Sequence, residues 1–356
     1  MTRIFSGHIY IFHAFDVGED INLNAIAQES SIAKKTITPA KYFKNYHRPI
    51  DIVLPEQGEP SNYCEAIKIH HFGVVSLTYK IPFKSTLEDL RHEIDNIERK
   101  YREQGATDAA VVYRLIERFI KNPNFFHINT SYLLIQVNTQ EDLPGKQLEE
   151  KHGGTIASIL RFEDESLSEF KKNEILEQAF GYYRGDFIAV DTDATFLYDD
   201  EYEEALDLFE FVNIQHLELQ YFDRMLDQKL TQAYTGSPQA PLSCSYLPGS
   251  GKKSCASQVE NLGMLKVEIS VITERLENSI KIVGEPYFYE LYMALNTALD
   301  LSNWKESINK KLEIIHDLSE VYENRARTAR EDLFNILISV LIFLELIVAI
   351  AQFWHR

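Results

Sequence analysis

Two aspartates are the first residues in this sequence that could do chemistry. Asp191 and Asp193 stand two apart in "IAVDTDATF", and a pair of carboxylates can divide acid and base work between them in hydrolysis. The same Asp-Thr-Asp run also suits a tight turn, because aspartate side chains bond to backbone amides close by in the chain. The sequence therefore allows two interpretations, a β-hairpin turn or the catalytic pair of a hydrolase.

A loop near residue 250 has some features of a phosphate-binding motif. A Walker-type loop requires glycine, four residues and then Gly-Lys followed by a hydroxyl residue. In "YLPGSGKKS", Tyr246 stands in place of the first glycine and Lys253 in place of the hydroxyl residue. Nucleotide binding is therefore not expected here.

Histidines and cysteines show no pattern typical of metal binding. His70 and His71 are adjacent in a predicted strand, so their side chains point to opposite faces and cannot share one metal ion. Cys64, Cys244 and Cys255 are too few and too scattered for a disulfide framework or a four-cysteine zinc site. We predict no metal site, no cofactor and no catalytic residue, and we do not expect the chain to be an enzyme.

The net charge of the chain limits the partners it can bind, and its first residues limit where the protein is located. The formal net charge is -18, and no block rich in lysine or arginine offsets it, so direct binding of nucleic acid is disfavoured. The first residues resemble neither a cleaved signal peptide nor an arginine-rich presequence. The amino-terminal bulk is therefore expected to stay in the compartment where it is made.

Residues 1–200 alternate between strand-like and helix-like patterns, which predicts an α+β domain with a mixed, partly antiparallel sheet. Apolar residues three and four apart predict a helix from Leu87, with Ser85 or Thr86 as its N-cap. Acidic residues at 199–204 would begin another helix, where the macrodipole favours carboxylates; a metal site is the alternative interpretation of this cluster. Runs of β-branched and aromatic residues predict strands at 7–15, 66–81, 130–138 and 155–162, and a second helix is predicted at 106–121.

Residues 201–331 have long helical periodicity. This pattern predicts an antiparallel helical hairpin, or stalk, that follows the α+β domain. Glycine, proline and serine are dense at 235–256, which predicts a flexible linker at the bend of the hairpin. The helical pattern breaks again at Gly284 and Pro286 before it resumes.

The last segment, 332–354, is strongly apolar but contains Glu345. As a helix, Leu333 to Trp354 would span roughly 33 Å, enough for a hydrocarbon core. A central glutamate costs about 2.5–3.5 kcal/mol on insertion scales, less than the apolar side chains gain, so we predict one carboxyl-terminal transmembrane helix. The polar residues of this segment fall on one stripe of the helix: Asn335, Ser339, Glu345 and Gln352. We expect this stripe to face another helix of a homo-oligomer. The alternative is a single helix in which Glu345 is protonated in lipid.

Arginines before this segment predict its orientation. Arg325, Arg327 and Arg330 precede the span, and the positive-inside rule keeps positively charged flanks in the cytoplasm. We therefore expect a single-pass, tail-anchored protein of the inner (cytoplasmic) cell membrane, with its amino-terminal domain in the cytoplasm.

Several quoted stretches resemble one known family. "HFGVVSLTYKIP", "NIQHLELQYFDRMLDQKL" and "GEPYFYELYMALNTALDLSNWKESINKKLEIIHDLSEVY", followed by the apolar end, are similar to the required-for-meiotic-nuclear-division proteins and their bacterial membrane-protein branch. The resemblance is best from Tyr182 to Trp354 and weak before Glu65. It implies a membrane-anchored, self-associating protein and supplies no catalytic residues.

Together these patterns predict a tail-anchored, self-associating scaffold or tethering protein without catalytic activity. Its expected partners are the lipid bilayer, further copies of itself and a protein that the sequence does not identify. One alternative is an ion-transport protein of CorA-like outline, although the chain has one predicted span and lacks the Gly-Met-Asn signature of that family. The other is a membrane-bound hydrolase that uses Asp191 and Asp193.

Overall fold

The structure is a computed structural model. It describes residues 3–36, 48–53, 63–125, 128–183, 185–235, 267 and 285–354. Within the helices it describes the backbone alone at 232–235, 318–319, 322–323, 325–327, 329–330, 332–333 and 351–354. Apart from Thr235, the predicted linker 235–256 lies outside the described residues.

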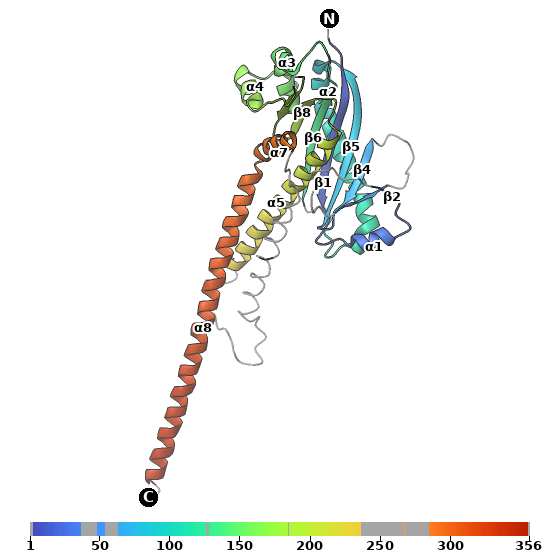
Figure 1. The fold of residues 1–356 in the computed structure, drawn as a ribbon. Coiled ribbons are helices and arrows are strands. Elements are labelled where there is room, and N and C mark those ends of the chain that lie inside the picture. Colours follow the sequence, from blue (N-terminus) through green and yellow to red (C-terminus); the bar gives the residue numbers. More distant parts are fainter. Residues whose placement is uncertain are drawn as a thin grey trace. The chain divides into compact units, whose positions relative to one another are not determined.

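Eight strands form one sheet in the order β2-β3-β4-β5-β1-β6-β8-β7 (Figure 1). Neighbouring strands are antiparallel except for β6 and β8, which are parallel. The prediction of an α+β domain with a mixed sheet is therefore confirmed. The strands are β1 (Phe5–Asp16), β2 (Lys34–Lys35), β3 (Ile50–Ile52), β4 (Cys64–Ile69), β5 (Val74–Ser85), β6 (Asn129–Val137), β7 (Phe187–Val190) and β8 (Ala194–Tyr198).

Helices cover both faces of this sheet. On one face, Ile9 of β1 shares a core cluster with Leu90 of α2 and Ile156 of α3. On the other face, the Phe12 ring stacks on Phe209 of α5 at 6.3 Å between centroids. Alternate residues of β1 thus serve two cores, which explains its almost continuous burial. The helices are α1 (Leu23–Gln28), α2 (Leu87–Ile116), α3 (Gly145–Leu160), α4 (Glu169–Leu176), α5 (Glu203–Thr235), α7 (Pro286–Ala298) and α8 (Leu301–Trp354), with a 3-10 turn at Glu117–Phe119.

Helix α2 combines the two helices predicted on either side of Gly105. Its N-cap is Thr86, whose hydroxyl accepts the amide of Asp89 at 3.0 Å. The helix continues through Gly105, where a Cβ atom would lie 2.7 Å from the His13 ring. Glycine is therefore needed at this position for close helix–sheet packing and not as a helix stop.

The predicted strand at 155–162 is wrong, because 155–160 form the end of α3. Ile156, Ile159 and Leu160 are fully buried there. Their β-branched and aliphatic side chains suit a strand, but burial of one helical face against the sheet outweighs that weak local preference.

A buried polar network joins α5 to the sheet. Lys68 of β4 forms ion pairs with Glu210 and, at 3.2 Å, with Asp207. The Ser76 hydroxyl of β5 donates to the same Glu210 carboxylate. Burial opposes the charge on Lys68, but these carboxylates outweigh it and raise the pKa of the lysine. The network fixes the position of α5 over β4 and β5.

The chain divides into two compact units, 1–221 with 276–305, and 222–275 with 306–356. In the second unit, Lys311 of α8 pairs with Asp223 at 2.7 Å and Asp227 at 2.8 Å of α5. Ser307 also donates to Asp223 at 2.7 Å. These bonds hold α8 against the end of α5. The predicted boundaries at 200/201 and 331/332 stay predictions.

Among the described residues, no helix combines the length and the apolar character needed to cross a membrane. Within the apolar end of α8, Glu345 places an acidic side chain near the middle of the predicted span, where a charge opposes insertion. This finding contradicts the predicted transmembrane helix at 332–354. It also contradicts the tail-anchored topology and the inner-membrane location.

Candidate functional site

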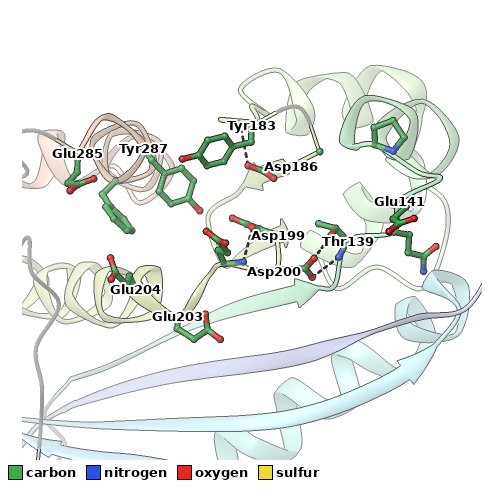
Figure 2. Close-up of a pocket in the computed structure, with 15 residues that line it drawn as sticks. Thr139, Glu141, Tyr183, Asp186, Asp199, Asp200, Glu203, Glu204, Glu285 and Tyr287 are labelled. Atoms are coloured by element: carbon green, nitrogen blue, oxygen red, sulfur yellow. Dashed lines mark hydrogen bonds between the residues drawn. The ribbon is translucent and has the colours of Figure 1, made fainter.

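A large acidic cavity opens in the first unit beside the end of β8 (Figure 2). Its volume is about 1090 Å³, and no lysine, arginine or histidine is among the described residues that line it. Its walls come from the segment after β6, the start of α3, the loop before β7, the start of α5 and the start of α7. Eight carboxylates line it: Glu141, Asp186, Asp199, Asp200, Glu201, Glu203, Glu204 and Glu285.

Hydrogen bonds hold the carboxylates at the end of β8 in place. Asp199 is only 8% exposed, and it accepts the amide of Glu201 at 2.9 Å. Asp200 accepts the amide of Thr139 at 2.9 Å and also its hydroxyl. The segment after β6 and the segment after β8 are thus tied together, as expected where two parallel strands end at the same edge of a sheet.

The pKa values of two groups in the cavity are raised. Burial raises the pKa of the Asp186 carboxyl, and repulsion from Asp199 and Asp200 adds to this although the Tyr183 amide opposes it. Burial also raises the pKa of the Tyr287 hydroxyl, with the negative charges of Asp199 and Asp186 as the next causes. The cavity therefore has a strongly negative potential, which favours the protonated form of its own acids.

Aromatic rings form another part of the wall. Tyr183, Tyr287 and Phe288 line the cavity, and the Tyr287 ring extends from α7 toward Asp199 and Tyr183 (Figure 2). Tyr182 packs edge-on against Tyr287 at 5.6 Å between centroids. Aromatic faces beside carboxylates suit an organic cation, which gains from both cation–π and ionic contacts.

The described carboxylates are not arranged as a metal site. Throughout the described ranges, no three residues among histidine, cysteine, aspartate and glutamate converge with a geometry that would hold a metal ion. The eight carboxylates instead line a wide space. Their arrangement fits an extended cationic group better than a compact ion.

The structure places Asp191 and Asp193 in the turn between β7 and β8. The amide of Asp191 bonds to the carbonyl of Ala194 at 2.9 Å, and its carboxylate forms an ion pair with Arg161 at 2.5 Å. The hairpin prediction is confirmed, and Asp191 acts as a turn and ion-pair residue. Neither aspartate lines the acidic cavity.

The predicted polar stripe lies on α8 in the second unit. Ser339 and Glu345 lie on the exposed surface of α8 among Ile342, Phe343 and Leu346. The Ser339 hydroxyl donates to the carbonyl of Asn335 at 2.8 Å. The side chains of Gln352, Arg325, Arg327 and Arg330 lie outside the described residues, and the proposal that the polar stripe faces another helix stays a prediction.

Sequence reasoning missed the acidic cavity. The acidic run at 199–204 was interpreted as a helix start, with a metal site as the alternative, and not as the wall of a wide cavity. The aromatic wall could not be predicted from the sequence. Tyr287 is far from Asp199 in the sequence, and the two come together only because α7 packs near the end of β8.

Comparison with known proteins finds a matching family for the amino-terminal part of the chain. Residues 6–204 match a family model described as "Uncharacterized protein MJ0711, N-terminal domain". The chain is 27% identical over 199 residues to the uncharacterized protein MJ0711 of Methanocaldococcus jannaschii. This match covers 55% of the chain and 59% of that relative, so the chain spans less than two thirds of the relative's length. No solved structure matches.

These matches correct the resemblance to the required-for-meiotic-nuclear-division family. That resemblance was strongest from Tyr182 onward and rested on Leu, Tyr and Trp patterns in helices. The matches instead cover 6–204 and point to a different family. Helical patterns of this kind recur in unrelated proteins because any amphipathic helix needs them.

Proposed function

The chain belongs to the family of the MJ0711 N-terminal domain, and on that premise we propose that it is a non-catalytic, self-associating scaffold protein. One observation carries this proposal. Along 334–350 of α8, the large apolar side chains are between 47% and 65% exposed. A contiguous apolar surface of this size is unusual on a single soluble chain and typical of an interface.

A second copy of the chain is the partner that the pattern favours. Ile308, Leu312 and Ile315 are buried in the second unit, and their alternating spacing of four and three residues continues along the exposed part of α8. It passes through Ile336, Val340, Phe343, Ile347 and Ile350. This sustained 3.5-residue period is the pattern of a coiled-coil seam between identical helices.

More than two copies are expected in the assembly. Leu337, Leu341 and Leu344 lie away from the seam and are also more than half exposed. One partner helix covers a single stripe, so the remaining apolar faces require further neighbours. Identical copies around an axis along α8 form a closed, parallel bundle in which each residue faces its equivalents.

Cysteine crosslinking of the full chain tests this arrangement. In a background with Cys64, Cys244 and Cys255 replaced by serine, V340C chains should crosslink to one another through the seam. E331C, on a different face of the same helix, is the matched control and should crosslink much less. Light scattering should give a mass of at least three chains. A monomer at tens of micromolar protein would refute the proposal.

A second candidate function is recognition of a basic segment of a partner protein by the acidic cavity. The observation that favours it is the lining of eight carboxylates and three aromatic rings without a described basic residue. A scaffold needs a second binding surface besides its own assembly interface, and lysine or arginine side chains would be attracted there by charge and by the aromatic faces.

Peptide binding tests this second function. A tetralysine peptide should bind the full chain, and E203Q and E285Q should each weaken binding several-fold because both side chains line the cavity. E177Q, an exposed site outside the cavity, is the control. If tetralysine binds the three variants equally well, attraction by the overall negative charge explains binding and the cavity has no special role.

A further inference from the structure

A second cavity in the first unit has the opposite character from the acidic one. Its volume is about 380 Å³, and Arg3, Lys151 and His152 contribute basic groups to its lining. They come from the segment before β1 and from α3. A concentration of basic side chains around a cavity stands out in a chain whose net charge is -18.

The guanidinium of Arg3 has a donor nitrogen that makes no hydrogen bond to the described residues. Its Nη2 atom pairs with Asp142, but its buried Nη1 atom has no hydrogen-bond partner among the described residues. A buried donor without a partner is costly, and a bound acceptor would remove that cost. Arginine also suits oxyanions because its planar fork can donate two parallel hydrogen bonds.

Lys151 adds a second positive charge to the lining of the cavity, and His152 lies next to it in α3. The Nζ atom of Lys151 makes one long contact, at 3.4 Å, with Gln147. Burial lowers the pKa of His152, and the charges of Arg3 and Lys151 add to this effect while Glu88 opposes it. His152 is therefore neutral at neutral pH and offers a bound anion a hydrogen bond but no charge.

The acidic residue of the lining is already engaged. Glu88 accepts the Thr155 hydroxyl at 2.7 Å on one oxygen and pairs with Arg91 at 2.8 Å through the other. Both of its oxygens therefore already have partners. Thr86 and Leu87 place the first turn of the long helix α2 at the cavity as well, and the helix dipole there favours an anion.

We propose that this cavity binds a small organic phosphate, with the phosphate between Arg3 and Lys151 and the organic part against the apolar wall. Phe5, Leu87 and Leu143 supply that wall. The volume exceeds what a phosphate group alone fills, so an organic part has room. This proposal is independent of the scaffold function, since every lining residue lies in the first unit.

Calorimetric titration of the full chain with phenyl phosphate and inorganic phosphate tests the site. Both should bind, with phenyl phosphate at least several-fold tighter. R3Q and K151Q should each weaken phenyl phosphate binding about tenfold, whereas K146Q, exposed on the same helix α3, should leave it within twofold. Sodium chloride at equal ionic strength should not compete. Urea midpoints for the variants show that each is folded.

Nuclear magnetic resonance of His152 gives a second readout. Bound phosphate should raise the pKa of His152, because an anion stabilises the imidazolium, and R3Q should reduce this effect of the ligand. Absence of binding at millimolar phenyl phosphate would overturn the proposal. Equal affinity of phenyl phosphate and inorganic phosphate would overturn its organic part, and equal binding by R3Q, K151Q and K146Q would overturn the assignment to this cavity.

Discussion

At the residue scale, Gly105 shows how one missing side chain permits a close packing contact. The His13 ring lies under α2 at this point, and its Nε2 atom bonds to the Tyr101 carbonyl at 3.1 Å. Burial of the ring, only partly offset by that bond, lowers the pKa of His13 to about 4, so it is neutral at neutral pH. Any side chain at 105 would push against this fixed ring.

Replacing Gly105 by alanine should therefore destabilise the protein although alanine favours helices. The new Cβ would approach the His13 ring to 2.7 Å, and overpacking of this kind costs about 1–3 kcal/mol. Gly154 in α3 is the control, because nothing lies within 4 Å of its added Cβ. G154A should gain about 0.5–1 kcal/mol. Urea unfolding measures both, and a gain for G105A would contradict the packing argument.

Glu218 is a buried acid whose charge works against folding. It is 5% exposed, and burial, with Asp16 as the next cause, raises the pKa of its carboxyl well above 4.5. The unfolded chain releases this proton at a lower pH than the folded chain. Stability should therefore fall as the pH rises from about 4.5 toward the folded pKa, by up to ~1.4 kcal/mol per pH unit.

The variant E218Q removes this titration while keeping the size of the side chain. We expect it to be more stable than the original chain at pH 7, with a difference that shrinks as the pH approaches 4.5. Urea midpoints measured across this range give the result. A difference that does not change with pH would show that the proton of Glu218 is not the cause.

At the element scale, the ion pair between Lys68 and Glu210 ties α5 to β4. The side chains are 14% and 8% exposed, so the charges are largely shielded from solvent. K68M would leave Glu210 buried without its ammonium partner, which costs about 3–5 kcal/mol. The exposed Lys84 of β5 is the control, and K84M should change stability by less than about 0.5 kcal/mol.

The double variant K68M/E210M separates the charge from the packing. Paired apolar replacements of similar volume often recover most of the loss, because no charge is left buried. We therefore expect the double variant to be more stable than K68M alone. Additive losses in a double-mutant cycle would mean that the two side chains do not depend on each other.

Several elements could be predicted from the sequence because their local pattern and their burial agree. The run at 7–15 pairs as the strand β1. The run at 66–81, predicted as one strand that includes His70 and His71, instead forms β4 and β5 with a turn at 70–73 between them. The segment 155–162 was misread because two isoleucines resemble a strand, whereas contacts distant in sequence fold it as a helix. The helix from Leu87 and the helix at 106–121 were predicted as two, because the sequence does not show that Gly105 packs against His13 inside one continuous helix.

The acidic cavity depends even more on contacts distant in sequence. Its carboxylates at the end of β8 are visible in the sequence, but the position of Tyr287 follows from α7 returning to the sheet. The pairing of β6 with β8 also brings Thr139 to Asp200. No periodicity in a single sequence reports such contacts, since they belong to the tertiary fold.

At the scale of the whole molecule, the exposed end of α8 separates folding from assembly. Side chains at 334–350 are exposed, and none of them belongs to the main buried core. A chain ending at residue 333 should keep the folded core of the first unit, because the deleted side chains contribute nothing to it, and circular dichroism of the truncated and full chains checks this. Light scattering should show it as a monomer. Loss of the folded state on truncation would contradict this separation.

The central place of the first strand has a consequence for how the chain reaches its native state. Gly7 is paired with Val137 on one side and Phe83 on the other, so β1 is synthesised well before either neighbour. Closing such long loops is entropically slow, and high contact order lowers folding rates. During that interval the apolar residues of β1 are uncovered, and refolding yield should decline as protein concentration rises.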